Sequence, residues 1–259
     1  MYLETNNLTK HFGGTIALDD VSLEFPAGQI TAVIGSNGAG KTTLFNTIAG
    51  FVEPDSGSVR LVREDGGTPA QIDLTSLPPS RIARSGIGVL FQDIRVFGHL
   101  TAIENVVVGK QHQWGENPIR TLFMPGVVGR QDRDNLAEAK QHLDFVGLSD
   151  KASQWASTLS YGQQKLIALA RVLATDASVI LLDEPTSGIH PTMIDTLLGL
   201  VERLAHEQNK AVIMIEHNLN VVRRVGDWVY LMAGGRAEVF GKPDEVLRDD
   251  ALIRTYPTL

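Results

Sequence analysis

The stretch Gly35-Ser-Asn-Gly-Ala-Gly40-Lys41-Thr42 decides the fold of this 259-residue chain. It matches G-x-x-x-x-G-K-[ST] and directly follows the apolar run Ile30 to Ile34, which predicts a strand before it and a helix after it. Glycines let the backbone wrap until its N–H groups point at phosphate oxygens, and the positive end of the helix adds to that attraction. In this pattern Lys41 reaches the β and γ phosphates and Thr42 can ligate Mg²⁺. The stretch therefore predicts a phosphate-binding loop.

The composition around this loop is that of an ordinary globular protein, with 43% hydrophobic residues and no cysteine. The missing cysteines exclude disulfide frameworks and thiolate metal sites. With 30 acidic and 23 basic side chains the net charge is −7, which argues against a nucleic-acid partner. No apolar run approaches the roughly 20 residues that cross a membrane, so any membrane role requires a partner.

Short apolar runs alternate with helical patterns, which is typical of an α/β architecture around a largely parallel sheet. The first 28 residues and Ser58 to Leu74 alternate differently and predict an antiparallel layer beside that sheet. The predicted core strands are Gln29 to Ile34, Ile87 to Phe91, Val179 to Leu182, Ala211 to Ile215 and Trp228 to Met232.

The helical patterns lie mainly in the second half of the chain. Gln163 to Ala174 is apolar nearly all round and predicts a buried helix. Residues 109–131 hold four glycines and two prolines, and we expect them to be irregular. Two amphipathic helices are predicted by stripes at helical spacing, one from Leu136, Ala139, Leu143 and Val146, the other from Ile194, Leu197, Leu198, Val201 and Leu204.

A second motif is the apolar run that starts at Val179 and ends in the adjacent carboxylates Asp183 and Glu184. Beside a phosphate-binding loop, Asp183 is placed to bind Mg²⁺ and Glu184 to activate a water at the γ-phosphate. The guanine-reading N-K-x-D motif is absent from the sequence, which argues against a GTPase. These residues alone leave kinases, helicases and transport ATPases open.

The stretch Leu159-Ser-Tyr-Gly-Gln-Gln164 resembles the LSGGQ signature of ATP-binding cassette (ABC) ATPases. The order of the motifs is similar to that family's over essentially the whole chain. The resemblance implies a P-loop NTPase fold with a RecA-like core, an antiparallel β layer and an inserted helical signature subdomain. The implied parts of this single ABC ATPase domain are a core of residues 1–92 and 176–242, a helical subdomain of 93–175 and a helical tail of 243–259.

The resemblance also assigns roles to individual residues. It implies an ATP hydrolase with ATP and Mg²⁺ as cofactors, in which Phe12 stacks on adenine and the signature completes the pocket of a second subunit. The implied catalytic residues are Glu184, His217, Gln92 and Lys41, and the implied Mg²⁺ ligands are Thr42, Gln92 and Asp183. The implied ATP-binding residues are Phe12, Gly35, Ser36, Asn37, Gly38, Ala39, Gly40, Lys41, Thr42 and Thr43, and the signature residues are Leu159, Ser160, Tyr161, Gly162 and Gln163.

One position departs from the family pattern. After Asp183-Glu-Pro-Thr-Ser-Gly188 the family usually has Leu-Asp or Leu-Asn before the proline, whereas this chain has Ile189-His190. Because histidine can donate and accept hydrogen bonds, it can replace the asparagine. Its protonation near neutral pH would make subunit contact depend on pH.

Within the family the sequence resembles the ATPase subunits of branched-chain amino-acid importers and their urea or amide relatives. The implied partners are a second ABC ATPase, as homodimer or sister subunit, transmembrane permeases and, indirectly, a periplasmic or extracellular substrate-binding protein. This places the chain at the cytoplasmic face of the plasma membrane. Lipopolysaccharide-export ATPases share much of the pattern and stay open, as does a non-transport ABC ATPase. The supporting matches are Phe12 to Gly14, Phe91 to Asn105, the insert 109–131 and the tail Gly241 to Tyr256.

Overall fold

The structure, a computed structural model, describes residues 1–65, 68–111, 113 and 125–248. It divides into two compact units. The sheet unit comprises Met1–Gln92, Ser178–Ser187 and the residues from Val201 onward, and the helical unit comprises Asp93–Ala177 and Gly188–Leu200.

Residues 188–200 belong to the helical unit, whereas the sequence placed them with the core. Two close approaches explain this grouping. A Cβ added to Gly188 would lie 3.1 Å from the ring of Tyr161, and one added to Gly162 would lie 3.0 Å from Cγ of Met193. Residues 188–200 therefore pack against the start of the helix Tyr161–Leu173, which carries the signature residues.

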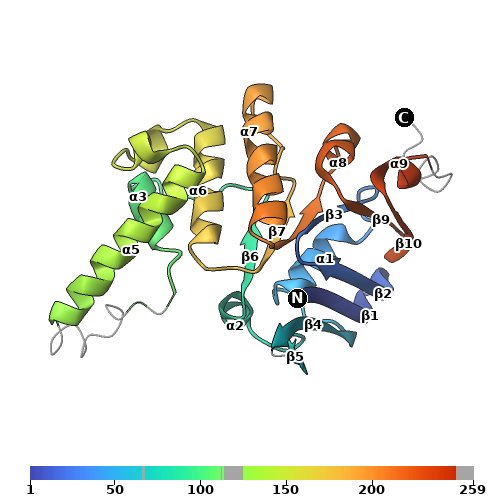
Figure 1. Ribbon diagram of the computed structural model, residues 1–259. Helices are drawn as coiled ribbons and strands as arrows, with labels where there is room; N and C mark the ends of the chain where they lie inside the picture. Colours follow the sequence, from blue (N-terminus) through green and yellow to red (C-terminus); the bar gives the residue numbers. More distant parts are fainter. Residues whose placement is uncertain (66–67, 112, 114–124, 249–259) are drawn as a thin grey trace. The chain divides into compact units, whose positions relative to one another are not determined.

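A six-stranded sheet in the order β10-β9-β3-β8-β7-β6 forms the centre of the sheet unit (Figure 1). β10 pairs antiparallel with β9, and the other pairs are parallel. The α/β fold class is thereby confirmed, and the five predicted strands occur within one residue of their expected ends. The strands are β3 (Gln29–Ile34), β6 (Ile87–Leu90), β7 (Val179–Asp183), β8 (Ala211–Ile215), β9 (Trp228–Ala233) and β10 (Arg236–Gly241).

The register of this sheet places the carboxyl ends of its strands side by side. Val33 pairs with Ile215, and Ile215 pairs with Asp183. Leu182 in turn pairs with Leu90 at the end of β6. Residues that follow these strands therefore gather at one edge, where open α/β sheets bind their ligands.

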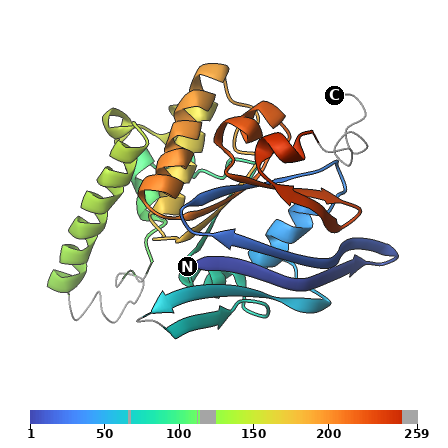
Figure 2. The same ribbon diagram turned by 45° about the vertical axis from the view of Figure 1, so that its right-hand side comes forward.

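The predicted antiparallel layer is a four-stranded sheet in the order β2-β1-β4-β5. Helix α1 (Lys41–Ile48) lies between the two sheets, where Leu44 and Ile48 are fully buried in a core shared with both (Figure 2). This packing fixes the helix that follows the phosphate-binding loop. The strands are β1 (Tyr2–Phe12), β2 (Thr15–Pro26), β4 (Ser56–Asp65) and β5 (Thr68–Asp73).

Helix α5 (Pro125–Phe145) corrects two expectations about the helical unit. Residues 125–131, expected to be irregular, are helical, and residues 112 and 114–124 of that insert lie outside the described part of the chain. Leu136 is 43% exposed, although its spacing predicted burial. The buried stripe instead passes through Asn135, because a stripe that begins at Val128 reaches position 135 after two helical turns.

The remaining described elements connect these layers. The helix Pro191–Glu202 is followed by a π-helical turn, Arg203–Glu207, that the sequence did not predict. Among the described residues, no helix has both the length and the apolar character needed to cross a bilayer. Of the predicted helical tail, one short helix is described, and residues 249–259 lie outside the description. These elements are α2 (Pro79–Arg84), α3 (Ala102–Val107), η2 (Ser149–Lys151), η3 (Ala156–Thr158), α6 (Tyr161–Leu173), α7 (Pro191–Glu202), η4 (Arg203–Glu207), α8 (Leu219–Val225) and α9 (Pro243–Val246).

Candidate nucleotide-binding site

The loop between β3 and α1 surrounds a buried lysine. Lys41 is 5% exposed, and its Nζ donates hydrogen bonds to the carbonyl oxygens of Gly35 at 2.7 Å and Ser36 at 2.9 Å. Burial lowers the pKa of Lys41, while the charges of Glu184 and Asp183 oppose that shift. The loop thus holds an ammonium group directly beneath its own backbone.

The start of α1 is not capped by any side chain of its own. Its N-cap residue, Gly40, has φ of 102°, a left-handed conformation that favours glycine. A Cβ at this position would lie 2.3 Å from the carbonyl oxygen of Ala17, so no larger residue fits. The first N–H groups of the helix therefore point out of the loop without a side-chain acceptor, which is the geometry of an anion site.

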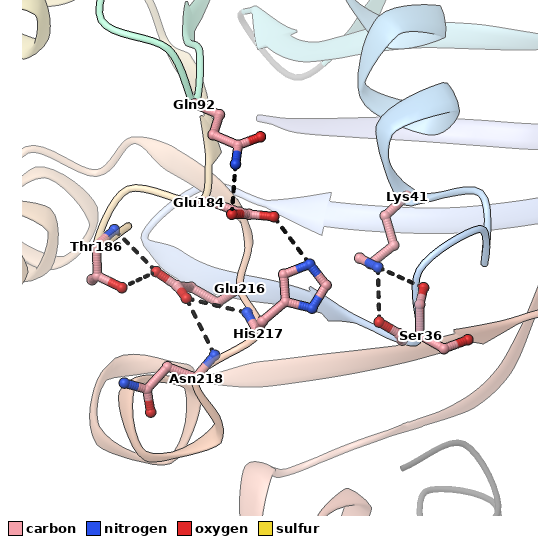
Figure 3. A network of polar contacts seen from close by, with 9 residues as sticks. Ser36, Lys41, Gln92, Glu184, Thr186, Glu216, His217 and Asn218 are labelled. Carbon is pink, nitrogen blue, oxygen red and sulfur yellow. Dashed lines mark hydrogen bonds and ion pairs between the residues drawn. The ribbon is translucent and has the colours of Figure 1, made fainter. Parts of the chain in front are cut away.

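Glu184 follows β7 and is held from two sides (Figure 3). Gln92, just beyond β6, donates from Nε2 to Oε2 of Glu184 at 3.0 Å. Nε2 of His217, just beyond β8, lies 3.0 Å from Oε1 of the same carboxylate. The backbone N–H of Glu184 donates to the carbonyl of Ile215 at 3.0 Å, which ties the two strand ends together. The sheet therefore brings the three polar residues predicted at its strand ends into one contact.

A cavity of about 340 Å³ opens at this edge of the sheet. It includes most of the predicted phosphate-binding residues together with Glu184 and His217. Phe12 is not among its lining residues. That side chain is 52% exposed and pairs across the hairpin with Thr15, which does line the cavity. The lining residues are Thr15, Ile16, Ala17, Asn37, Gly38, Ala39, Gly40, Lys41, Thr42, Thr43, Glu184, Ile215 and His217.

Sequence reasoning missed two contributions to this site. The hairpin residues Thr15, Ile16 and Ala17 carry no motif, and only the pairing of β1 with β2 places them at the cavity. Glu216 is 3% exposed and accepts hydrogen bonds from neighbouring backbone. A carboxylate directly after the fully buried strand β8 was the available signal, because such a group requires partners.

The residues that could hold Mg²⁺ are oxygen donors. Asp183 ends β7 and influences the pKa of Lys41, while Thr42 lines the cavity on the first turn of α1. Mg²⁺ is usually bound by one or two carboxylates together with substrate phosphates, so a carboxylate and a hydroxyl fit this ion.

The signature residues lie in the helical unit at the start of α6. Ser160 is the N-cap: its Oγ accepts from the backbone of Gln163 at 3.3 Å, and Oε1 of Gln163 accepts from the backbone of Ser160 at 3.0 Å. Leu159 is buried, while Tyr161 is 46% exposed. The segment forms a rigid helix start with a serine hydroxyl at its tip.

His190 occupies the position before α7. Its Nδ1 lies 3.0 Å from Oγ1 of Thr192 and 3.4 Å from the Thr192 backbone nitrogen. The exposed imidazole thus supplies the acceptor that an asparagine or aspartate would supply at a helix start.

A family profile described as ABC transporter matches residues 18–187. The chain is 34% identical over 254 residues to the high-affinity branched-chain amino acid transport ATP-binding protein BraF of Pseudomonas aeruginosa, with 98% of this chain and 96% of the relative covered. It is 33% identical over the same length and coverage to LivG of Escherichia coli, which carries the same description.

Solved structures of ABC transporter cassettes are also similar to this chain. The ADP conformation of MJ1267, an ATP-binding cassette of an ABC transporter, matches with a TM-score of 0.83 and 31% identity over 100% of both chains. The dimeric structure of MJ0796, a bacterial ABC transporter cassette, matches with a TM-score of 0.74 and 26% identity, covering 93% of this chain and 98% of the other.

Proposed function

Because this chain belongs to the ABC transporter family, as one of its ATP-hydrolysing subunits, we propose that it powers the uptake of branched-chain amino acids or related urea or amide compounds. Two relatives described as branched-chain amino acid transport ATP-binding proteins support this substrate class over nearly the full chain. The proposed partners are a second cassette, transmembrane permeases and a substrate-binding protein outside the membrane. The chain then acts at the cytoplasmic face of that membrane.

The observation that carries the hydrolytic role is the Glu184 carboxylate, held at 3.0 Å by both Gln92 and His217 beside the cavity. A carboxylate fixed from two sides is ready to accept a proton from an attacking water without reorganising. His217 then donates to a phosphoryl oxygen, on which negative charge develops.

The phosphate-binding loop supplies most of the binding. Lys41 and the uncapped N–H groups of α1 pair with the β and γ phosphates. Mg²⁺ held by Thr42 and Asp183, with Gln92 close by, would offset charge on the phosphates. Phe12 is exposed, as a residue that stacks on adenine has to be.

The second cassette completes the arrangement. Two copies bind head to tail with two ATP molecules between them, so that Ser160 of one copy contacts the nucleotide of the other. Closure then pulls on permease segments docked near Gln92, Arg95 and Phe97. The exposed Phe97 ring, 51% accessible, supports such a docking surface.

The test is uptake by purified transporter in vesicles. The tagged chain is purified with the membrane proteins that accompany it and reconstituted, and ATP-dependent accumulation of leucine, isoleucine, valine and urea is measured. We expect uptake of at least one of these compounds. In the matched Glu184→Gln complex, hydrolysis should fall by roughly 100-fold or more while ATP still binds and the cassettes stay dimeric.

Two results would contradict the proposal in different ways. Recovery of soluble companions only, or of lipopolysaccharide-handling membrane proteins, would overturn the importer role. Undiminished turnover in the Glu184→Gln complex would remove Glu184 from the role of base and leave the transport role to be decided by uptake.

A further inference from the structure

The carboxylate of Glu216 lies beside His217 and Thr186, and Glu216 is only 3% exposed (Figure 3). It directly precedes His217, and four hydrogen bonds converge on it. Oε1 accepts from the backbone N–H of Thr186 at 3.1 Å and from its hydroxyl at 2.5 Å. Oε2 accepts from the backbone N–H groups of His217 at 3.2 Å and Asn218 at 3.4 Å.

These donors come from two separate segments of the sheet unit. Thr186 lies two residues after Glu184, in the turn that follows β7, whereas His217 and Asn218 follow β8. The side chain of Asn218 in turn accepts from the backbone of Asn220 at the start of α8. One buried side chain therefore fixes the turn beyond β7 to the turn beyond β8 and to the helix that follows.

From this geometry we propose that Glu216 is a positioning residue, whose carboxylate sets the placement of His217 relative to Glu184. Both oxygens are used as acceptors, and each serves a different segment, so the two turns cannot separate without leaving the buried donors of Thr186 or the part-buried backbone N–H groups of His217 and Asn218 unpaired. This inference rests on the proposed roles of Glu184 and His217 in hydrolysis.

The chemistry of the site explains why a glutamate is required. Glutamine has a similar shape but turns one acceptor into an NH₂ group, which would face N–H donors. Aspartate is shorter by one methylene, about 1.5 Å, and cannot reach both turns. Since the donors of Thr186 are buried and destabilise their segment when they lack an acceptor, either change should let the two turns move apart.

The test compares Glu216→Gln with two variants of its partner, Thr186→Val and Thr186→Ser. For each variant, kcat, KM for ATP, equilibrium ATP binding and Tm are measured. We expect Glu216→Gln to lower kcat on the order of tenfold to a hundredfold, with KM changed by less than about threefold, because Lys41 and its loop are untouched. In Thr186→Val kcat should also fall, but by a smaller factor. In Thr186→Ser kcat should stay close to that of the unmodified protein.

The matched control is Thr5→Val, because Thr5 is 1% exposed and accepts a hydrogen bond from Leu23 far from the cavity. It should lower Tm with kcat retained, which separates a positioning role from general loss of stability. A second readout uses His217→Ala. If Glu216 acts through His217, adding Glu216→Gln to His217→Ala should cause almost no further loss of the residual turnover.

Full kcat in Glu216→Gln, or an equal loss with and without the histidine, would overturn the inference. Should Glu216→Gln fail to fold, the same comparison is made with Thr186→Val: its loss of kcat is measured in the presence and in the absence of His217→Ala. If His217→Ala and Glu184→Gln both keep full turnover, the proposed hydrolytic roles fail, and that result is distinct from a silent Glu216.

Discussion

Two helix starts in this protein solve the same physical problem in opposite ways. The first N–H groups of any α-helix lack partners within the helix. At α1 the N-cap is Gly40, which offers no side chain, so these groups remain for a ligand. At α6, Ser160 and Gln163 satisfy each other's backbone in a reciprocal cap. The first start is built to receive an anion, and the second is stable without one.

The difference teaches how each unit contributes to a shared reaction. The loop before α1 depends on backbone shape, and its neighbours Ala17 and Met232 leave no room for a Cβ at Gly40 or Gly35. The start of α6 depends on one hydroxyl, which accepts a backbone hydrogen bond and can still donate its own hydrogen. Loss of the loop's backbone shape should thus weaken ATP binding strongly, while loss of the hydroxyl should reduce turnover.

The largest effect is expected from Gly40→Ala. A left-handed alanine is strained by about 1 to 2 kcal/mol, and its Cβ would meet the Ala17 carbonyl at 2.3 Å. The loop has to open, so ATP affinity should fall on the order of a hundredfold or more. Isothermal titration with a non-hydrolysable ATP analogue measures this.

The control for that change is Gly129→Ala in α5, where an added Cβ meets no described atom within 4 Å. Its ATP affinity should be unchanged. Near-normal affinity in Gly40→Ala would show that the loop tolerates a side chain and would break the contrast between the two helix starts.

An intermediate effect is expected from Ser160→Ala. Loss of the N-cap should lower the free energy of unfolding by about 1 kcal/mol. Turnover should fall by roughly 10- to 100-fold, because in the proposed dimer this hydroxyl contacts the nucleotide of the second copy. ATP binding to the isolated chain should be retained. Stopped-time phosphate release and calorimetric unfolding give the two numbers.

Thr101→Ala is the matched control, because Thr101 and Glu104 form the same reciprocal cap at α3. The free energy of unfolding of Thr101→Ala should fall by about as much as that of Ser160→Ala, while its turnover should be unchanged. Equal turnover in the two alanine variants would reduce Ser160 to a structural cap.

The smallest expected effect is on the pH dependence of stability, and it again compares two helix caps, those of α3 and α6. Hydrogen bonds from the backbone and hydroxyl of Thr101 lower the pKa of Glu104 from its usual 4.5. A lowered carboxyl pKa stabilises the fold above 4.5, and the contribution disappears as pH falls through the folded-state value. The cap at α6 uses Gln163, which does not titrate.

The corresponding experiment follows Tm of the unmodified protein and of Glu104→Gln from pH 7 to pH 3. Glu104→Gln should melt slightly lower at pH 7, and the two curves should draw together as pH falls from 4.5 through the folded-state pKa of Glu104. A difference that does not narrow at all between pH 4.5 and pH 3 would assign the effect to packing instead of charge.

Much of the fold could be predicted because its signals are local. The core strands ended within a residue of their predictions, and the family was confirmed from contiguous motifs. Position 136 shows the limit of such patterns. A leucine there fitted the helical spacing, yet the helix begins at Pro125, within the segment expected to be irregular, and buries Asn135 instead.

The sequence by itself determined the phosphate-binding loop, because eight consecutive residues encode both its backbone shape and its lysine. Only the tertiary structure decided what surrounds it. Gln92, Glu184 and His217 meet because β6, β7 and β8 are neighbours in register, and strand order is not written in any one segment. The same holds for Glu216, whose partners follow two neighbouring strands, Thr186 after β7 and His217 after β8. Local chemistry selects a motif, whereas contacts between distant segments depend on how the whole sheet assembles.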